Sequence, residues 1–226
     1  MEEEELIEVK GKKQSRSIVP QKDVDVLTVS TSATDAWIKS ELTLKWTSPL
    51  EFRDSTIQYK AAYDTGNTLL GERRIITQTF AAINSEIDNS LKYVKGYIAD
   101  MFTKENAKAY YTQFGIEKAG NKYAIPRDND TRQHSLEKMI KALDSNDMGT
   151  RKYGKTYWEA LYHRFVNTKQ AASTRDGETS VQVSNKAELK AKIIKTLNAL
   201  ISLVKANYPD NWKEELRMWG FQKEKY

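Results

Sequence analysis

The chain has 226 residues, with 39 % hydrophobic and 30 % charged side chains and a formal net charge of +5. This length fits one large domain or two small ones, and five Trp, twelve Tyr and six Phe provide more apolar surface than a disordered chain carries. Because the chain has no cysteine, disulfide bonds, thiol nucleophiles, iron–sulfur clusters and cysteine-based zinc sites are excluded.

Residues 1–20 are predicted to form a flexible N-terminal arm, because four consecutive glutamates repel one another and few apolar residues could anchor it. The arm is acidic and has no long apolar run, so its sequence does not predict a secretory signal. The most apolar stretch, residues 193–204, is also too short for a membrane span, which needs about 20 apolar residues. We therefore expect a cytoplasmic protein with no membrane partner.

Residues 23–46 are ambiguous between helix and strand. Their apolar residues can form one helical face, but the β-branched run VLTVSTS favours a strand. The alternation of Leu42, Leu44 and Trp46 also favours a strand. We interpret the segment as a helix.

The next two helices are predicted from a cap and an apolar stripe. Ser48 and Glu51 fit a capping box at a helix start, and Gly66 and Gly71 are expected to interrupt that helix. A long helix is therefore predicted separately over about residues 69–102. Its apolar residues recur at spacings of three and four, which favours near-parallel packing against other helices. They are Ile76, Phe80, Ile83, Ile87, Val94, Tyr97 and Met101.

A connecting loop is predicted at residues 117–130, where Gly120 and Pro126 break regular structure. It separates a helical subdomain at residues 21–116 from a second helical subdomain at residues 131–226. A helix is predicted to begin at Asp130, the last residue of this loop.

The remaining elements of the second subdomain are predicted in chain order. A helix begins at Thr156, and residues 173–184 form a loop. Asn185 caps a second long helix over about residues 186–207, and an aromatic C-terminal tail follows it. This helix carries an apolar stripe of Leu189, Ile193, Leu197, Leu200 and Val204.

Together these elements predict an all-α fold, an elongated helical bundle of five to seven helices. One long bundle and two packed helical subdomains both fit the pattern.

Each histidine stands at helical spacing from a glutamate, and together the four side chains are enough ligands for zinc or iron. They are His134 with Glu137, and Glu159 with His163. A di-iron bundle, however, needs four carboxylates and two Glu-x-x-His motifs, which the sequence lacks. No phosphate-binding glycine loop and no Gly-x-Ser-x-Gly motif occurs either. We therefore predict no metal, no cofactor and no enzymatic activity.

The segment from Arg151 to Phe165 interleaves basic and aromatic residues. Residues 101–170 hold 13 basic and 8 acidic side chains and residues 171–226 hold 10 and 7, so the basic excess lies in the C-terminal part. Cations attract phosphates and bases stack on aromatic rings, which makes single-stranded nucleic acid a candidate partner. Part of the aromatic content also fits a helix core. The candidate nucleic-acid contacts are Arg151, Lys152, Lys155 and Arg164.

The C-terminal tail is unusual because chain ends are normally polar. Its aromatic side chains either cap the bundle of this chain or anchor a partner or a second copy. The candidate partner-binding residues are Trp212, Trp219, Phe221 and Tyr226.

The sequences FGI at residues 114–116, Ile125-Pro126, ANYPD at residues 206–210 and the terminal WGFQKEKY resemble a set of uncharacterised helical-bundle proteins of Bacteroidetes-type bacteria. The resemblance covers about the last half of the chain and implies no activity, cofactor or catalytic residue. It favours a bacterial or phage-borne protein.

We predict a non-enzymatic structural or protein–protein interaction protein that self-associates through helix faces or the aromatic tail. The alternative is a nucleic-acid-binding helical protein that uses residues 151–165.

Overall fold

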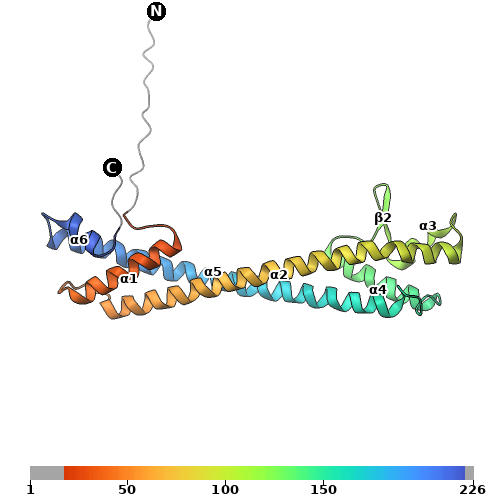
Figure 1. Cartoon of the computed structure of the whole chain (residues 1–226), viewed down its shortest axis with the longest axis horizontal. Helices are drawn as coiled ribbons and strands as arrows, with labels where there is room; N and C mark the ends of the chain where they lie inside the picture. The colour runs from red at the N-terminus through yellow and green to blue at the C-terminus, as the bar shows by residue number, and fades with distance from the viewer. Residues whose placement is uncertain (1–17, 222–226) are drawn as a thin grey trace, which may run out of the picture. The chain divides into compact units, whose positions relative to one another are not determined.

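The computed structural model describes residues 18–221 and shows an all-α protein, which confirms the predicted fold class (Figure 1). The predicted arm lies outside the described residues up to position 17, as does Tyr226. No helix in the described range is both long and apolar enough to cross a membrane. The six α-helices of this range are α1 (Asp23–Lys39), α2 (Pro49–Phe102), α3 (Ala107–Tyr110), α4 (Asn129–Ser145), α5 (Lys155–Asn207) and α6 (Trp212–Met218).

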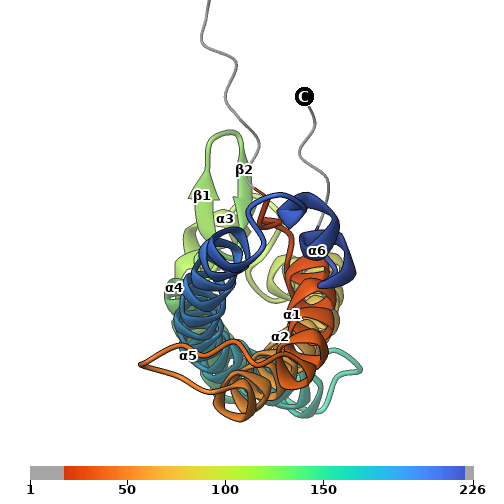
Figure 2. The same cartoon turned by 90° about the vertical axis from the view of Figure 1, so that its left-hand side faces the viewer.

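The predicted loop at residues 117–130 contains a small β-hairpin. Strand β1 (Glu117–Ala119) pairs antiparallel with β2 (Lys122–Ala124), and the hairpin projects outward from its unit (Figures 1 and 2). Gly120 takes the positive φ of 60° that the tight turn requires. Because the strands are only three residues long, the sequence pattern showed the turn but not the pairing.

The chain folds into two compact units that divide it differently from the predicted subdomains. Unit 1 contains residues 18–65 and 182–221 of the described range, and unit 2 contains residues 66–181. The reason is the length of α2 and α5, which have 54 and 53 residues and each contribute to both units. The boundary therefore falls inside two helices, where no composition change marks it.

Neither predicted helix interruption is present. Gly66 and Gly71 lie within α2, and the predicted loop at residues 173–184 is wrong because those residues are helical in α5. A glycine weakens a helix by about 1 kcal/mol relative to alanine, which contacts with a neighbouring helix can offset. Here an ion pair of 2.9 Å joins Arg175 of α5 to Glu72 of α2.

The core of unit 1 confirms the apolar stripe that the sequence predicts in the C-terminal part of α5, from Leu189 to Val204. All five stripe residues are buried there. They pack with Val26, Val29, Ala33 and Trp37 of α1, with Phe52 and Tyr59 of α2, and with Leu216 of α6. The predicted helix at residues 23–46 is correct as far as Lys39, and the following residues form an irregular connection. The capping box is present, because the backbone N–H of Ser48 donates to Glu51 at 2.8 Å.

The core of unit 2 uses the predicted stripe of α2. Ile83, Ile87 and Val94 are buried, whereas Met101 at the end of the helix is exposed. The stripe packs against Leu136 and Met139 of α4, Trp158 and Phe165 of α5, and Phe114 and Ile116 before the hairpin. Asp128, two residues before the predicted start, caps α4 by accepting from the backbone N–H groups of Asp130 and Thr131.

An ionic cluster ties α1 to α5 within unit 1. The carboxylate of Asp23 accepts hydrogen bonds from Lys186 at 2.8 Å, Lys190 at 2.5 Å and the Tyr59 hydroxyl at 2.9 Å. Burial alone would raise the pKa of Asp23, but the hydrogen bonds from the two lysines and Tyr59 outweigh it and hold the pKa well below its usual range. Burial and the neighbouring carboxylate raise the pKa of Tyr59.

The C-terminal tail closes the same unit. Trp219 and Phe221 are buried in the unit 1 core. Gly220 between them has a φ of 87° and lies against α1, where an added Cβ would come within 2.5 Å of the Ser32 Cβ. Only glycine fits this position without a shift of the surrounding backbone, so it allows the tail to return to α1.

We expect Asp23→Asn to lower the free energy of unfolding by about 2 kcal/mol at neutral pH, because it removes a charged partner of two lysines. The folded-state pKa is lower than the unfolded value of about 3.9, so this contribution is full above that value and is lost as the pH falls below it. Urea denaturation at several pH values between neutral and acidic measures the difference in free energy of unfolding between Asp23→Asn and the wild-type chain. Asp25→Asn, in the same helical turn, is the control, and an equal effect of both substitutions would contradict the prediction.

We expect Trp219→Ala to lower the free energy of unfolding by about 3 kcal/mol, because it leaves a cavity in the unit 1 core. Chemical denaturation followed by circular dichroism measures this loss. The neighbouring Met218 is exposed, so Met218→Ala should change stability by less than about 0.5 kcal/mol. Equal stabilities of the two variants would show that the tail is not part of the core.

Candidate binding surfaces

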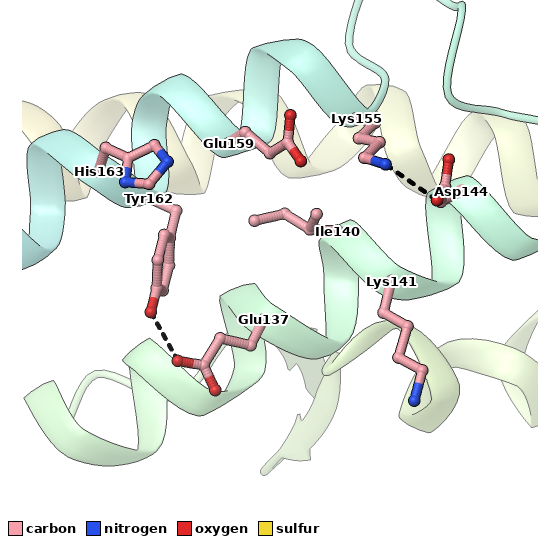
Figure 3. Close-up of a pocket in the computed structure, with 8 residues that line it drawn as sticks. All are labelled: Glu137, Ile140, Lys141, Asp144, Lys155, Glu159, Tyr162 and His163. Atoms are coloured by element: carbon pink, nitrogen blue, oxygen red, sulfur yellow. Dashed lines mark hydrogen bonds and ion pairs between the residues drawn. The ribbon is translucent and has the colours of Figure 1, made fainter.

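A polar groove lies between α4 and α5 in unit 2 (Figure 3). Its volume is about 390 Å³. Glu137, Ile140, Lys141 and Asp144 of α4 line it, together with Lys155, Glu159, Tyr162 and His163 of α5. Helical spacing of three and four places each set on one side of its helix. The groove therefore presents three carboxylates, two amines and an imidazole.

Two of the three carboxylates in this groove are already bonded. The Tyr162 hydroxyl donates to Glu137 at 2.6 Å, and the Lys155 ammonium donates to Asp144 at 3.0 Å (Figure 3). The first bond raises the pKa of Tyr162 and lowers the pKa of Glu137. The second raises the pKa of Lys155. These bonds join α4 to α5, so the groove residues have a structural role.

The structure brings three of the four Glu/His residues to this groove but leaves His134 outside its lining. His134 is an exposed residue of α4, with its Nδ1 3.6 Å from the Glu137 carboxylate. Among residues 18–221, no cluster of three or more His, Asp or Glu side chains is arranged to hold a metal ion.

Three of the four predicted nucleic-acid contacts are paired with carboxylates of this chain. Arg151 contacts Asp100 at 3.4 Å, Lys155 contacts Asp144, and Arg164 contacts Glu86 at 2.8 Å. Lys152 has no ion pair within the described range. The aromatic residues Trp158 and Phe165 are buried in the unit 2 core.

Two residues that the sequence analysis did not identify, Lys92 and Tyr93 of α2, lie beside Lys152 and Tyr153 of the predicted segment. Tyr153 stacks on Tyr93 of α2 with ring centroids 4.0 Å apart and planes 2° apart. Lys92 lies 4.9 Å from the centre of the Tyr93 ring, and Lys152 lies 5.6 Å from that of Tyr153. We call Lys92, Tyr93, Lys152 and Tyr153 the tyrosine–lysine cluster. The two Lys-Tyr dipeptides are the only sequence signal for it, and 58 intervening positions separate them.

Hydrogen bonding and nearby charge both lower the pKa of Tyr93 in this cluster. The hydrogen bond with Tyr153 lowers the pKa of Tyr93, and the charge of Lys92 lowers it further. The Arg151 guanidinium lies 4.5 Å from the centre of the Tyr97 ring beside the cluster. The surroundings of the Tyr93 hydroxyl are therefore electropositive.

An apolar surface lies on α1 and α2 of unit 1. A groove of about 250 Å³ runs between the two helices and is lined by Leu27, Thr28, Thr31, Thr56, Ile57 and Lys60. Val24 and Ile57 are 55 % and 56 % exposed, and Ile38 and Leu50 are also exposed. We call Val24, Leu27, Ile38, Leu50 and Ile57 the α1–α2 face.

The predicted partner-binding residues of the tail have different surroundings. Trp219 and Phe221 are buried within unit 1, so their side chains do not face a partner in this conformation. Trp212 is half-buried, with the ammonium of Lys205 4.3 Å from its ring centre. The tail therefore contributes to the core of its own chain.

In comparisons with known proteins, no protein-family model, curated protein or solved structure matches this chain, so the interpretation of these surfaces depends on their geometry and chemistry.

Proposed function

We propose that this chain is a non-enzymatic protein–protein interaction protein that self-associates through the α1–α2 face. The observation that carries the proposal is that α1 is apolar on two sides. One side, which includes Val26, Val29 and Trp37, is buried in the unit 1 core. The other side carries Val24 and Ile38, which are exposed. A helix with apolar residues on opposite sides is typical of packing against a neighbour on each side.

Helical spacing aligns the exposed residues into one surface. On α1, Leu27 follows Val24 by three positions and Ile38 follows Leu27 by eleven, and both spacings are close to whole numbers of helical turns. On α2, Leu50 and Ile57 are seven positions apart, which corresponds to about two turns. The groove between the helices connects the two rows. Removing such surface from water contributes about 25 cal/mol per Å², so covering it favours association.

The chemistry of the groove favours a second copy of this chain as the partner. Thr28, Thr31 and Thr56 supply uncharged side chains, and the one charged lining residue, Lys60, is paired with Asp64 at 2.6 Å. A groove whose one charge is already paired does not require an oppositely charged partner, so the same groove of a second copy is compatible with it. Two identical faces related by a two-fold axis form a closed dimer, the commonest symmetric assembly.

We expect the purified chain to form a concentration-dependent dimer in sedimentation velocity, and Ile57→Glu to weaken the dimer at least about tenfold by burying a charge in the contact. Ile75→Glu is the matched control. It makes the same substitution in α2, at a residue of unit 2 that is 64 % exposed, and should leave the dimer unchanged. Circular dichroism of each variant checks that the helices remain folded.

Two results would contradict this proposal. One is a monomer at every concentration up to the solubility limit. The other is an equal weakening of the dimer by Ile57→Glu and Ile75→Glu, which would show that the added negative charge acts without regard to its position.

A further inference from the structure

The tyrosine–lysine cluster combines an exposed aromatic surface with cations that lack a carboxylate partner. Tyr93 remains 39 % exposed although Tyr153 stacks on it. Lys92 and Lys152 contact the two rings, and neither forms an ion pair within residues 18–221. An ammonium that lies over an exposed ring is weakly held, by about 1 kcal/mol, so it can turn toward an arriving anion.

The local charge balance is positive. The three carboxylates in this stretch of α2, Glu86, Asp88 and Asp100, are each engaged by an arginine. Arg164 lies 2.8 Å from Glu86 and Arg151 lies 3.4 Å from Asp100, so these four charges cancel in pairs. Lys92 and Lys152 then remain as uncompensated charges beside the stacked rings. Such an area attracts anions through the sum of its charges.

We propose that the tyrosine–lysine cluster binds single-stranded nucleic acid. Unpaired bases expose ring faces that stack on aromatic side chains, and the phosphates between them attract lysines. The cluster supplies both groups within one small area, as stacked rings with a lysine over each. A base pair in a duplex has its faces covered by its neighbours, so the cluster favours a single strand.

This site is independent of the α1–α2 face, since all four residues belong to unit 2. It shares Lys152 and Tyr153 with the predicted segment at residues 151–165 but differs from that segment in its other residues. The other three candidate contacts, Arg151, Lys155 and Arg164, are paired with carboxylates of this chain. The cluster instead contains Lys92 and Tyr93, which lie on α2 beside the residues that precede α5.

The test is fluorescence anisotropy of a labelled oligo(dT) with the full-length chain at low and then raised salt. We expect binding at low salt that weakens steeply as salt increases, because phosphate contacts release counterions. The double variant K92E/K152E should weaken binding by at least about tenfold, since it reverses both uncompensated charges. The control is K104E/K138E, which makes the same charge change at two exposed unit 2 lysines that also lack ion pairs in the described range.

A second pair of measurements separates base stacking from charge. The variant Y93L/Y153L keeps both lysines but removes the rings, and should weaken oligo(dT) binding while leaving the binding of heparin, a polyanion without bases, unchanged. Circular dichroism confirms that each variant is folded.

Three outcomes would overturn the inference. These are no binding of oligo(dT) by the wild-type chain at low salt, an equal loss in K92E/K152E and K104E/K138E, and unchanged oligo(dT) binding by folded Y93L/Y153L. The last result would identify a general polyanion surface. None of these measurements reports the oligomeric state, so the self-association proposal is tested separately by sedimentation velocity.

Discussion

Burial of the apolar stripes of α2 and α5 is the constraint on which the rest of the structure depends. In each unit, a segment of α2 lies antiparallel to a segment of α5, and shorter elements cover the apolar surface that remains. In unit 1 these are α1 and α6, and in unit 2 they are α4 and the residues before the hairpin. Because two helices alone cannot bury both stripes, each added element is required for a closed core.

Charged residues are arranged mainly to connect these helices. Asp23 joins α1 to α5, Lys155 joins α5 to α4, and Arg164 joins α5 to α2. Other lysines of the described range, among them Lys104 and Lys138, form no ion pair. Among these lysines, Lys92 and Lys152 differ in that they lie over two rings that stack on each other.

The two proposals concern different surfaces and different types of interaction. The α1–α2 face is apolar and the one charge in its groove is paired, so its association would depend mainly on area removed from water. The tyrosine–lysine cluster is positive, so its binding would fall as salt increases. This difference separates the two activities in solution, although one chain carries both surfaces.

The sequence by itself determined the fold class, the two apolar stripes and the cap at Ser48, because these depend on residues within a few turns of one another. It did not determine the continuity of α2 and α5 through Gly66, Gly71 and the predicted loop at residues 173–184. Contacts between helices far apart in the chain decided that continuity. The same holds for the stacking of Tyr153 on Tyr93 and for the burial of Trp219 and Phe221 in their own unit. The spacing of apolar residues along the sequence specifies which side of a helix is apolar. Which residues pack against that side depends on contacts between distant parts of the chain, which form only in the tertiary structure.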